Sequence, residues 1–121
     1  MQLLIDEFAS VVKKYPRRIA INKPEREITY SELNHCIQLV ANWLNDQGFV
    51  KGDRVGIHLQ NTIEYIVLYY ACWRACLVPV ALNILARQRE IENWLDNSGC
   101  KIVFSETLKG VNFHIPVAVF G

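Results

Sequence analysis

One apolar run limits what this chain can fold into more than any other feature. It extends from Glu64 to Leu82 and reads EYIVLYYACWRACLVPVAL. A membrane-spanning helix needs about 20 consecutive apolar residues without charges. Here Arg74 stands mid-run, where a charge costs roughly 2.5–3.5 kcal/mol in a bilayer, and Pro79 prevents one continuous helix. We therefore expect no membrane span, and we expect the run to divide at Leu77 into a buried helix and an inner strand.

The composition is that of one globular domain. Of the 121 residues, 51% are apolar and 21% are charged, which is ordinary for a chain that buries a core. The formal net charge of +1 gives no reason to expect a nucleic-acid partner. The one basic cluster is KKYPRR, from Lys13 to Arg18, and we interpret it as the solvated end of a helix.

The termini and cysteines indicate the compartment. Acidic Asp6 and Glu7 stand where a secretion signal would be basic, so we expect no signal peptide. The four cysteines form no Cys-x-x-Cys pair, and we expect them to be small buried side chains in a reducing environment. These observations predict a cytoplasmic protein. The cysteines are Cys36, Cys72, Cys76 and Cys100.

The first part of the chain predicts a helix and a hairpin. The helix is expected from Leu3 to Lys14, and the hairpin from Arg18–Asn22 and Arg26–Thr29. Thr29 and Glu32 have the spacing of a capping box, which predicts the start of a second helix that ends at Gly48.

From Thr29 onward, helix and strand patterns alternate, which is typical of a parallel sheet with helices on its faces. We predict an α/β fold, with an open doubly wound, mostly parallel sheet that is preceded by a helix and a short hairpin. Residues 1–121 are treated as a single domain. The later elements expected are a strand at Asp53–Gln60, a helix capped by Asn61 or Thr62, a strand at Leu77–Leu82, a helix at Arg87–Ser98 with Ile91, Trp94 and Leu95 inward, and strands at Lys101–Ser105 and Ile115–Phe120.

Motifs for nucleotide or nucleophile chemistry are missing. The sequence contains no GxGxxG, GxxxxGK[ST] or GxSxG pattern. The turn Gln60-Asn61-Thr62 has no glycine with which to cradle a phosphate. His58 lies within a strand, where a half-buried, hydrogen-bonded histidine is more common than a catalytic base. The residues alone therefore predict no catalytic, cofactor-binding or metal-binding residue in this chain.

Three segments resemble the amino-terminal end of adenylate-forming enzymes. They are ITYSELN (28–34), KGDRVGIHLQNTIEYIVLYYACWRACLVPVALN (51–83) and EIENWLDNSGCKIVFSE (90–106). That superfamily contains acyl-CoA synthetases, nonribosomal peptide synthetase adenylation domains and luciferases. In it, a T/S-Y-x-E-L helix start, a G-D-R-V strand, an N-x-x-E helix and a V-P-V-x-x-N strand follow in this order.

The match to these motifs has departures that suggest a divergent member. Ala75-Cys76 stands where Ala-Gly is usual, Ile84 follows Asn83 where proline is common, and Gln60 replaces a frequent proline. Six residues do match motif positions, and for each a structural role in capping, packing or turning is sufficient. They are Tyr30, Glu32, Arg54, Glu64, Pro79 and Asn83.

The resemblance implies an ATP-dependent ligase of acyl-CoA synthetase type, with ATP, Mg and CoA required by the full-length protein. The family's Ser/Thr/Gly-rich segment ending in Pro-Lys-Gly, its acidic ribose-binding motif and its small lysine-bearing domain are not in this sequence. We therefore expect an inactive amino-terminal subdomain that has the remainder of the enzyme as its partner. We also expect an isolated chain to self-associate, as a homodimer, through exposed apolar surface. Two alternatives stay open: a fragment of a peptide synthetase adenylation domain, and a stand-alone, non-catalytic α/β interaction module.

Overall fold

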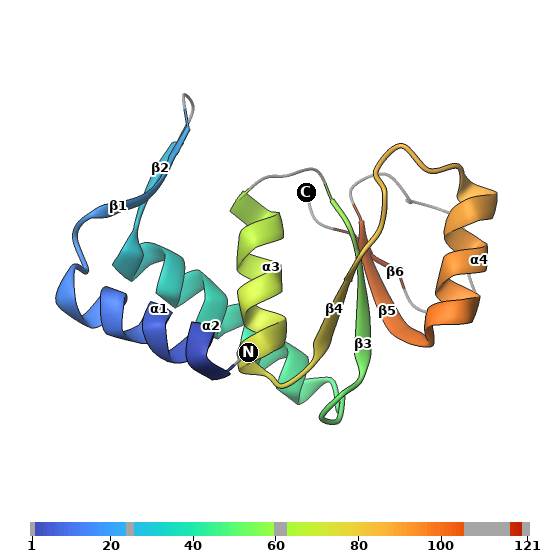
Figure 1. The fold of residues 1–121 in the computed structure, drawn as a ribbon, viewed down its shortest axis with the longest axis horizontal. Coiled ribbons are helices and arrows are strands. Elements are labelled where there is room, and N and C mark those ends of the chain that lie inside the picture. Colours follow the sequence, from blue (N-terminus) through green and yellow to red (C-terminus); the bar gives the residue numbers. More distant parts are fainter. Residues whose placement is uncertain (1, 24–25, 60–62, 106–116, 120–121) are drawn as a thin grey trace.

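The chain begins with a helix and an antiparallel hairpin that stand apart from the main sheet (Figure 1). The computed structural model describes residues 2–23, 26–59, 63–105 and 117–119. Within them, α1 (Gln2–Lys14) is followed by β1 (Ile19–Lys23) and β2 (Arg26–Thr29), which pair with each other. The predicted helix and hairpin are confirmed, with bounds that differ by one residue.

Helix α2 (Tyr30–Asp46) begins as its sequence predicts. The backbone N–H of Glu32 donates to Thr29 Oγ1 at 3.2 Å, and the N–H of Thr29 donates to Glu32 Oε1 at 3.1 Å. This reciprocal capping box satisfies two N–H groups that a helix start otherwise leaves without partners. Just after the helix, Gly48 has φ +84°, a conformation that glycine adopts without strain.

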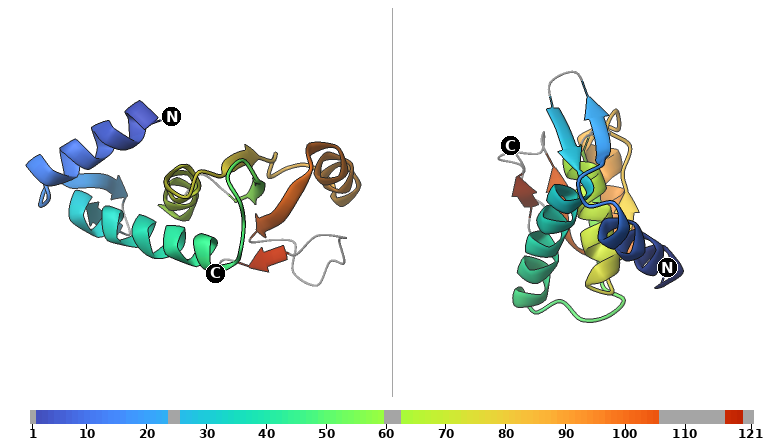
Figure 2. Two further views of the ribbon diagram at one scale, coloured as in Figure 1. Left: turned by 90° about the horizontal axis from the view of Figure 1, so that it is seen from below. Right: turned by 90° about the vertical axis from the view of Figure 1, so that its left-hand side faces the viewer.

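Four parallel strands form the main sheet in the order β4-β3-β5-β6. They are β3 (Arg54–His58), β4 (Val78–Ala81), β5 (Cys100–Ser105) and β6 (Val117–Val119). Helix α3 (Ile63–Arg74) links β3 to β4, and α4 (Gln88–Ser98) links β4 to β5. The two helices lie on opposite faces of the sheet (Figure 2). The predicted doubly wound fold is therefore confirmed.

The face covered by α2 and α3, here called the α2/α3 face, holds the larger core. Val55 and Ile57 of β3 and Phe104 of β5 point toward it, and Trp43 of α2 meets the Phe104 ring edge-on at 5.9 Å between centroids. Ala71 and Cys72 let α3 pack closely. The remaining buried members are Phe8, Ile28, Leu33, Ile37, Ala41, Leu44, Leu59, Ile63, Val67, Leu68, Leu77 and Ile102.

The opposite face, here called the α4 face, is built differently. Among the described residues, its buried apolar cluster comprises Leu82, Ile91, Leu95, Cys100 and Val103. A Cβ atom at Gly56 of β3 would lie 3.2 Å from both Leu95 Cδ2 and Val103 Cγ2. Glycine therefore lets α4 approach the sheet more closely than any other residue would.

The apolar run that opened the sequence divides into α3 and β4. Arg74, the charge within the run, ends α3 and donates to Asn34 Oδ1 at 3.0 Å and to Gln38 Oε1 at 3.2 Å, both on α2. Burial lowers the pKa of this guanidinium. Within the part of the chain that the structure describes, no helix has both the length and the apolar character needed to cross a bilayer.

Three expectations about burial are wrong. Among the described strands, β4 lies at the edge of the sheet and not inside it, because the chain returns across β3 through α4 before β5 begins. Trp94 is 46% exposed, since the narrow α4 face takes only Ile91 and Leu95. Cys76 is exposed, because it lies just beyond the end of α3.

The other cysteines are buried or half-buried, as expected. Burial raises the pKa of the Cys72 thiol to about 12, so this thiol is unreactive near neutral pH.

Strand bounds also differ from the predictions. β3 is shorter than the expected strand at Asp53–Gln60. Of the strand expected at Ile115–Phe120, residues 117–119 are confirmed as β6, and the other three lie outside the described residues. The expected caps Asn61 and Thr62 lie outside the described residues.

Candidate functional site

The order of the strands identifies one place at the sheet where a ligand site is expected. The chain moves from β3 to β4 on one side and then returns to β5 on the other side of β3. In open α/β sheets, ligands bind beyond the carboxyl ends of the strands at such a switch in direction. In this chain the switch lies at the carboxyl ends of β3 and β5.

Two buried polar residues, His58 and Ser105, end these two strands. They are directly opposite in the parallel register, and they are 2% and 0% exposed. His58 Nδ1 lies 2.9 Å from Ser105 Oγ, within hydrogen-bond distance. A buried imidazole and hydroxyl in contact hold the ends of β3 and β5 together, because separating them would leave two polar groups in an apolar interior.

The sequence predicted a hydrogen-bonded His58 within a strand, and the structure confirms this, with deeper burial than expected. The partner Ser105 was missed. Each of the two residues is polar and is the last residue of its strand. This shared position indicates a contact only once β3 and β5 are known to be neighbours.

The motif residues at the start of α2 have structural roles. The N–H of Thr29 donates to the exposed Glu32 carboxylate and lowers the pKa of that group, and the hydroxyl of Thr29 adds to the effect. Tyr30 packs on Phe8 of α1, with 6.3 Å between ring centroids. Glu32 therefore joins α2 to the hairpin through Thr29, and Tyr30 joins α2 to α1.

The other four motif residues are spread over the sheet. Arg54, at the start of β3, donates to the carbonyl of Ser98 at the end of α4. Glu64 lies in the first turn of α3, where a negative charge is favourable. The two remaining residues are Pro79 within the edge strand β4 and Asn83 in the turn after it, where Asn83 Oδ1 accepts from the Leu85 N–H at 2.9 Å.

The departure at Cys76 has a clear conformational consequence. Its φ is +63°, in the left-handed region that favours glycine. The N–H groups of Cys76 and Leu77 donate to the carbonyls of Trp73 at 3.1 Å and Cys72 at 2.8 Å. This is a complete Schellman motif. Residue 76 therefore adopts the left-handed conformation even though it is a cysteine and not a glycine.

The cavities that described residues line include three beside helices. One of about 680 Å³ lies between α1, the hairpin, α2 and α3. A second of about 310 Å³ lies between β4 and α4, and a third of about 430 Å³ lies beside β2 and α2. Neither His58 nor Ser105 lines any of the three. In the described part of the chain, no group of three His, Cys, Asp or Glu side chains is placed to hold a metal ion.

The strand order and the switch point beside β3 define an open, doubly wound α/β domain. Residues 8–117 match the AMP-binding enzyme family, so the chain belongs to that family.

Its relatives include several acid–thiol ligases. The medium-chain fatty-acid–CoA ligase of Escherichia coli is 31% identical over 106 residues, which are 87% of this chain and 19% of the relative. The 3-oxocholest-4-en-26-oate–CoA ligase of Rhodococcus rhodochrous is 32% identical over 83 residues, which are 69% of this chain and 15% of the relative. The chain thus spans less than a quarter of the length of either relative.

A solved structure has the same fold. It is the N-terminal subdomain of Klebsiella oxytoca NpsA in complex with anthranilyl-AMSN, at a TM-score of 0.84 and 26% identity. The similarity covers 97% of this chain and 30% of that subdomain. The resemblance to adenylate-forming enzymes is confirmed, and the chain corresponds to part of a larger adenylation enzyme.

Proposed function

We propose that this chain is the amino-terminal part of an acyl-CoA synthetase-like ligase. The larger protein would join a carboxylic acid to the AMP of ATP, with Mg, and then pass the acyl group to the thiol of CoA. The observation that carries the proposal is the family match over residues 8–117, supported by curated relatives that are CoA ligases.

The contribution of this chain to such a ligase is structural. Its own residues build the first four strands of a sheet and position the carboxyl ends of β3 and β5 through the His58–Ser105 contact. Phosphoryl chemistry needs cationic side chains, metal ligands and backbone donors that converge on the phosphates. No group of three His, Cys, Asp or Glu side chains that could hold a metal ion lies within the described residues. We therefore assign no catalytic, cofactor-binding or metal-binding residue, and no step through ATP, to this chain.

Pyrophosphate exchange with ATP and a panel of carboxylic acids tests this proposal. We expect no exchange from the 121-residue chain and acid-dependent exchange from the protein encoded by the complete natural reading frame. Turnover by the isolated chain would contradict the structural role. An inactive complete protein would contradict the ligase assignment.

A peptide synthetase adenylation domain is the second candidate, and the similarity to NpsA favours it. The acceptor of the acyl group separates the two candidates. A ligase of the first kind forms acyl-CoA from free CoA, whereas an adenylation domain loads the thiol of a carrier protein. Mass spectrometry of the complete protein's products with each acceptor distinguishes them.

The partner that we propose for this chain is the remainder of the same enzyme. Large apolar side chains of α2 and of the segment after β4 are exposed, among them Leu39, Trp43 and Leu85, and such surfaces promote association. We expect the isolated chain to form dimers in size-exclusion chromatography with light scattering. A clean monomer at high concentration would contradict this expectation.

The alternative to both enzyme fragments is a stand-alone, non-catalytic α/β interaction module. A stop codon directly after Gly121 in the natural reading frame would favour this alternative. The cytoplasmic location and the lack of a nucleic-acid partner stay predictions.

A further inference from the structure

The cavity of about 680 Å³ beside α1 has walls suited to an apolar ligand. Binding sites for small molecules are typically about 300–1,000 Å³, with mostly apolar and aromatic walls and a few polar groups. Here the polar lining residues are Glu7, Ser10 and Lys14. The apolar and aromatic walls are formed by Phe8, Val11, Tyr15, Ala20, Ile21, Tyr30, Leu33, Ile66 and Tyr70.

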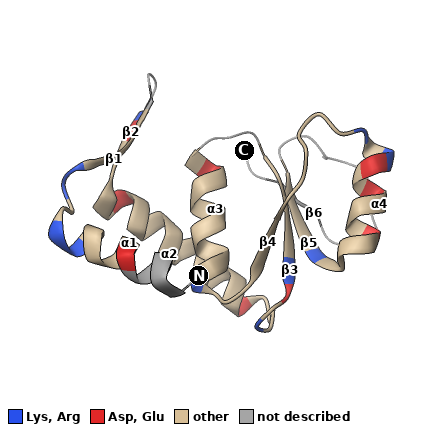
Figure 3. Ribbon diagram, in the orientation of Figure 1, with Lys and Arg blue, Asp and Glu red and all other residues tan. Residues whose placement is uncertain are grey.

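Positive charge is concentrated at one end of this cavity. Lys14 and Tyr15 both line it. The Lys14 Nζ atom lies 5.4 Å from the centroid of the Tyr15 ring, and the Arg18 guanidinium carbon lies 4.3 Å from it. Figure 3 shows the basic residues gathered at the end of α1 and in the chain that follows. The end of the cavity formed by Lys14 and Tyr15, here called the mouth, therefore has an aromatic ring with two cations against it, of which Lys14 lines the cavity and Arg18 does not.

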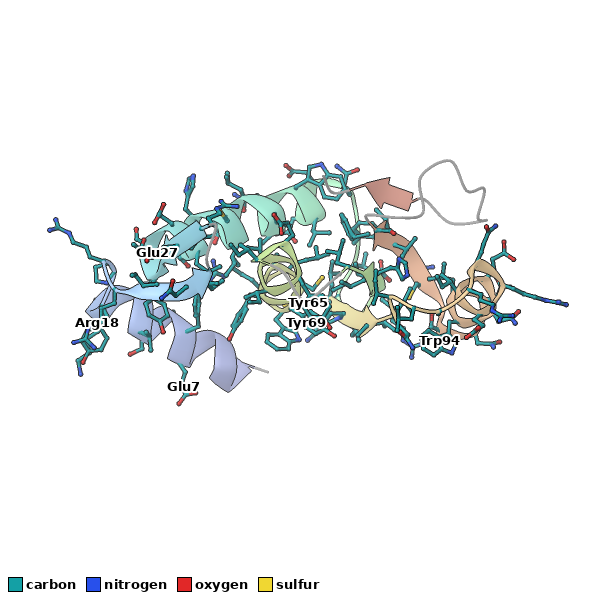
Figure 4. All side chains as sticks on the ribbon, turned by 90° about the horizontal axis from the view of Figure 1, so that it is seen from above. Glu7, Arg18, Glu27, Tyr65, Tyr69 and Trp94 are labelled. Atoms are coloured by element: carbon teal, nitrogen blue, oxygen red, sulfur yellow. The ribbon has the colours of Figure 1, made fainter. Side chains whose placement is uncertain are left out.

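One acidic residue, Glu7, also lines the cavity. It stands on α1 about two turns before Lys14, and its side chain extends outward from the helix (Figure 4). Arg18 lies at the other end of the same region (Figure 4). The cavity thus has mostly apolar walls and a cationic mouth, while its acidic residue, Glu7, stands in the middle of α1, about two turns before Lys14.

We propose that this cavity binds a monocarboxylic acid with an apolar tail. The tail lies against Phe8, Ile21 and Tyr70, and the carboxylate meets Lys14 at the mouth. The site is separate from the carboxyl edge of the sheet, because neither His58 nor Ser105 lines it. The proposal does not depend on the ligase activity proposed above.

The end of a helix favours basic residues for reasons unrelated to a ligand. That effect explains Lys13 and Lys14 equally, since both are in the last turn of α1. Of these two lysines, Lys14 lines the cavity and Lys13 does not. A bound carboxylate would therefore depend on Lys14 alone, whereas the effect of the helix end is the same for both.

Isothermal titration calorimetry of the 121-residue chain with decanoate, kept below its micelle concentration, tests the cationic mouth. We expect Lys14→Gln to weaken decanoate binding about 1.5-fold to fivefold, the range for an exposed ion pair. Lys13→Gln is the matched control and should leave binding unchanged. Decan-1-ol should bind equally well to both variants, because it has no charge to lose.

A second pair of variants tests the cavity itself. Ser10 is exposed and lines the cavity, whereas the neighbouring Ala9 is exposed and does not. Ser10→Trp should weaken both decanoate and decan-1-ol at least tenfold by filling the space, and Ala9→Trp should not. Both positions are at the surface, so the fold is retained in each variant, and circular dichroism checks this.

Amide chemical shifts in an NMR titration locate the bound ligand. We expect the largest changes at Phe8, Ile21, Tyr30 and Tyr70. Three results would each overturn the proposal: no binding by the unaltered chain, decanoate binding that Ser10→Trp leaves intact, or equal affinity for decyltrimethylammonium. Shift changes centred on β4 and α4 would overturn it as well, because they would place the ligand in the smaller cavity there.

Discussion

The two faces of the sheet achieve burial by different means. The α2/α3 face uses many large side chains from two helices and the strands, whereas the α4 face uses five residues and a glycine at the point of contact. The helix ends differ in the same way. α2 has a complete capping box, while Arg87 at the start of α4 makes no side-chain cap hydrogen bond. The α2/α3 face is therefore stabilised mainly by the amount of apolar surface that it buries, whereas the α4 face depends on the close approach of α4 to the sheet at Gly56.

The largest expected effect compares matched leucines on the two faces. Leu68 of α3 is 0% exposed and Leu95 of α4 is 1% exposed. We expect Leu68→Ala to lower the free energy of unfolding by about 3 kcal/mol. Leu95→Ala should cost less, about 2 kcal/mol, because α4 packs on a smaller cluster and can settle into the space. Urea denaturation measures both, with exposed Leu39→Ala as a control. If Leu95→Ala lowered the free energy of unfolding as much as Leu68→Ala or more, the two faces would not differ in how they are stabilised.

The second prediction concerns the close approach at Gly56. We expect Gly56→Ala to cost about 1–2 kcal/mol, because the added methyl group must displace Leu95 and Val103. The double variant Gly56→Ala, Leu95→Ala should cost less than the sum of the single variants, since the shorter side chain makes room. Strictly additive free energies in urea would show that crowding is not the reason for glycine here.

A third prediction exchanges the residues at two left-handed helix ends. Cys76 follows α3 at φ +63°, and Gly99 follows α4 at φ +70°. We expect Cys76→Gly to stabilise the protein by about 0.5–1 kcal/mol and Gly99→Ala to destabilise it by about 1 kcal/mol. Thermal unfolding reports both. Ala75→Gly is the control for flexibility alone and should be destabilising.

The smallest effect is the pH dependence of the α2 capping box. The pKa of the Glu32 carboxyl is lowered in the folded protein, so its stabilising contribution is complete above the unfolded-state pKa and is lost as the pH falls through the folded-state pKa. We expect Glu32→Gln to be less stable than the unaltered chain at pH 7, with the difference shrinking below pH 4.5, the ordinary pKa of this group. Glu90→Gln, at the corresponding position of α4, should lower the free energy of unfolding at pH 7 by less, because the start of α4 has no capping box. A pH-independent difference for Glu32 would contradict this account.

Local features of the fold were predictable from the sequence. Thr29 and Glu32 stand three positions apart, so the start of α2 depends only on residues that are neighbours in the chain. The same holds for Gly48 and Gly99, which end helices through their own backbone conformation. The alternation of strand and helix then limits the fold to a parallel sheet with helices on its faces.

Features that depend on strand order were not predictable. The contact between His58 and Ser105 joins residues 47 positions apart, and nothing local to either residue indicates the other. The exposure of Trp94 follows from the narrow α4 face, which a helical pattern alone does not reveal. The departure at Cys76 was visible as a residue type, and its left-handed conformation required the structure.

Pro79 has a consequence for how the sheet can grow. The N–H groups of Val78 and Leu82 donate to Asp53 and Ile57, so they point toward β3. Because successive residues of a strand alternate in direction, the nitrogen of Pro79 faces away from β3 and has no hydrogen to offer an incoming strand. The free edge of β4 is thereby blunted against unwanted strand addition at no loss to the existing ladder. Among the described strands, a strand that added along β4 would therefore lack one backbone donor, at Pro79, which favours growth of the sheet beyond β6.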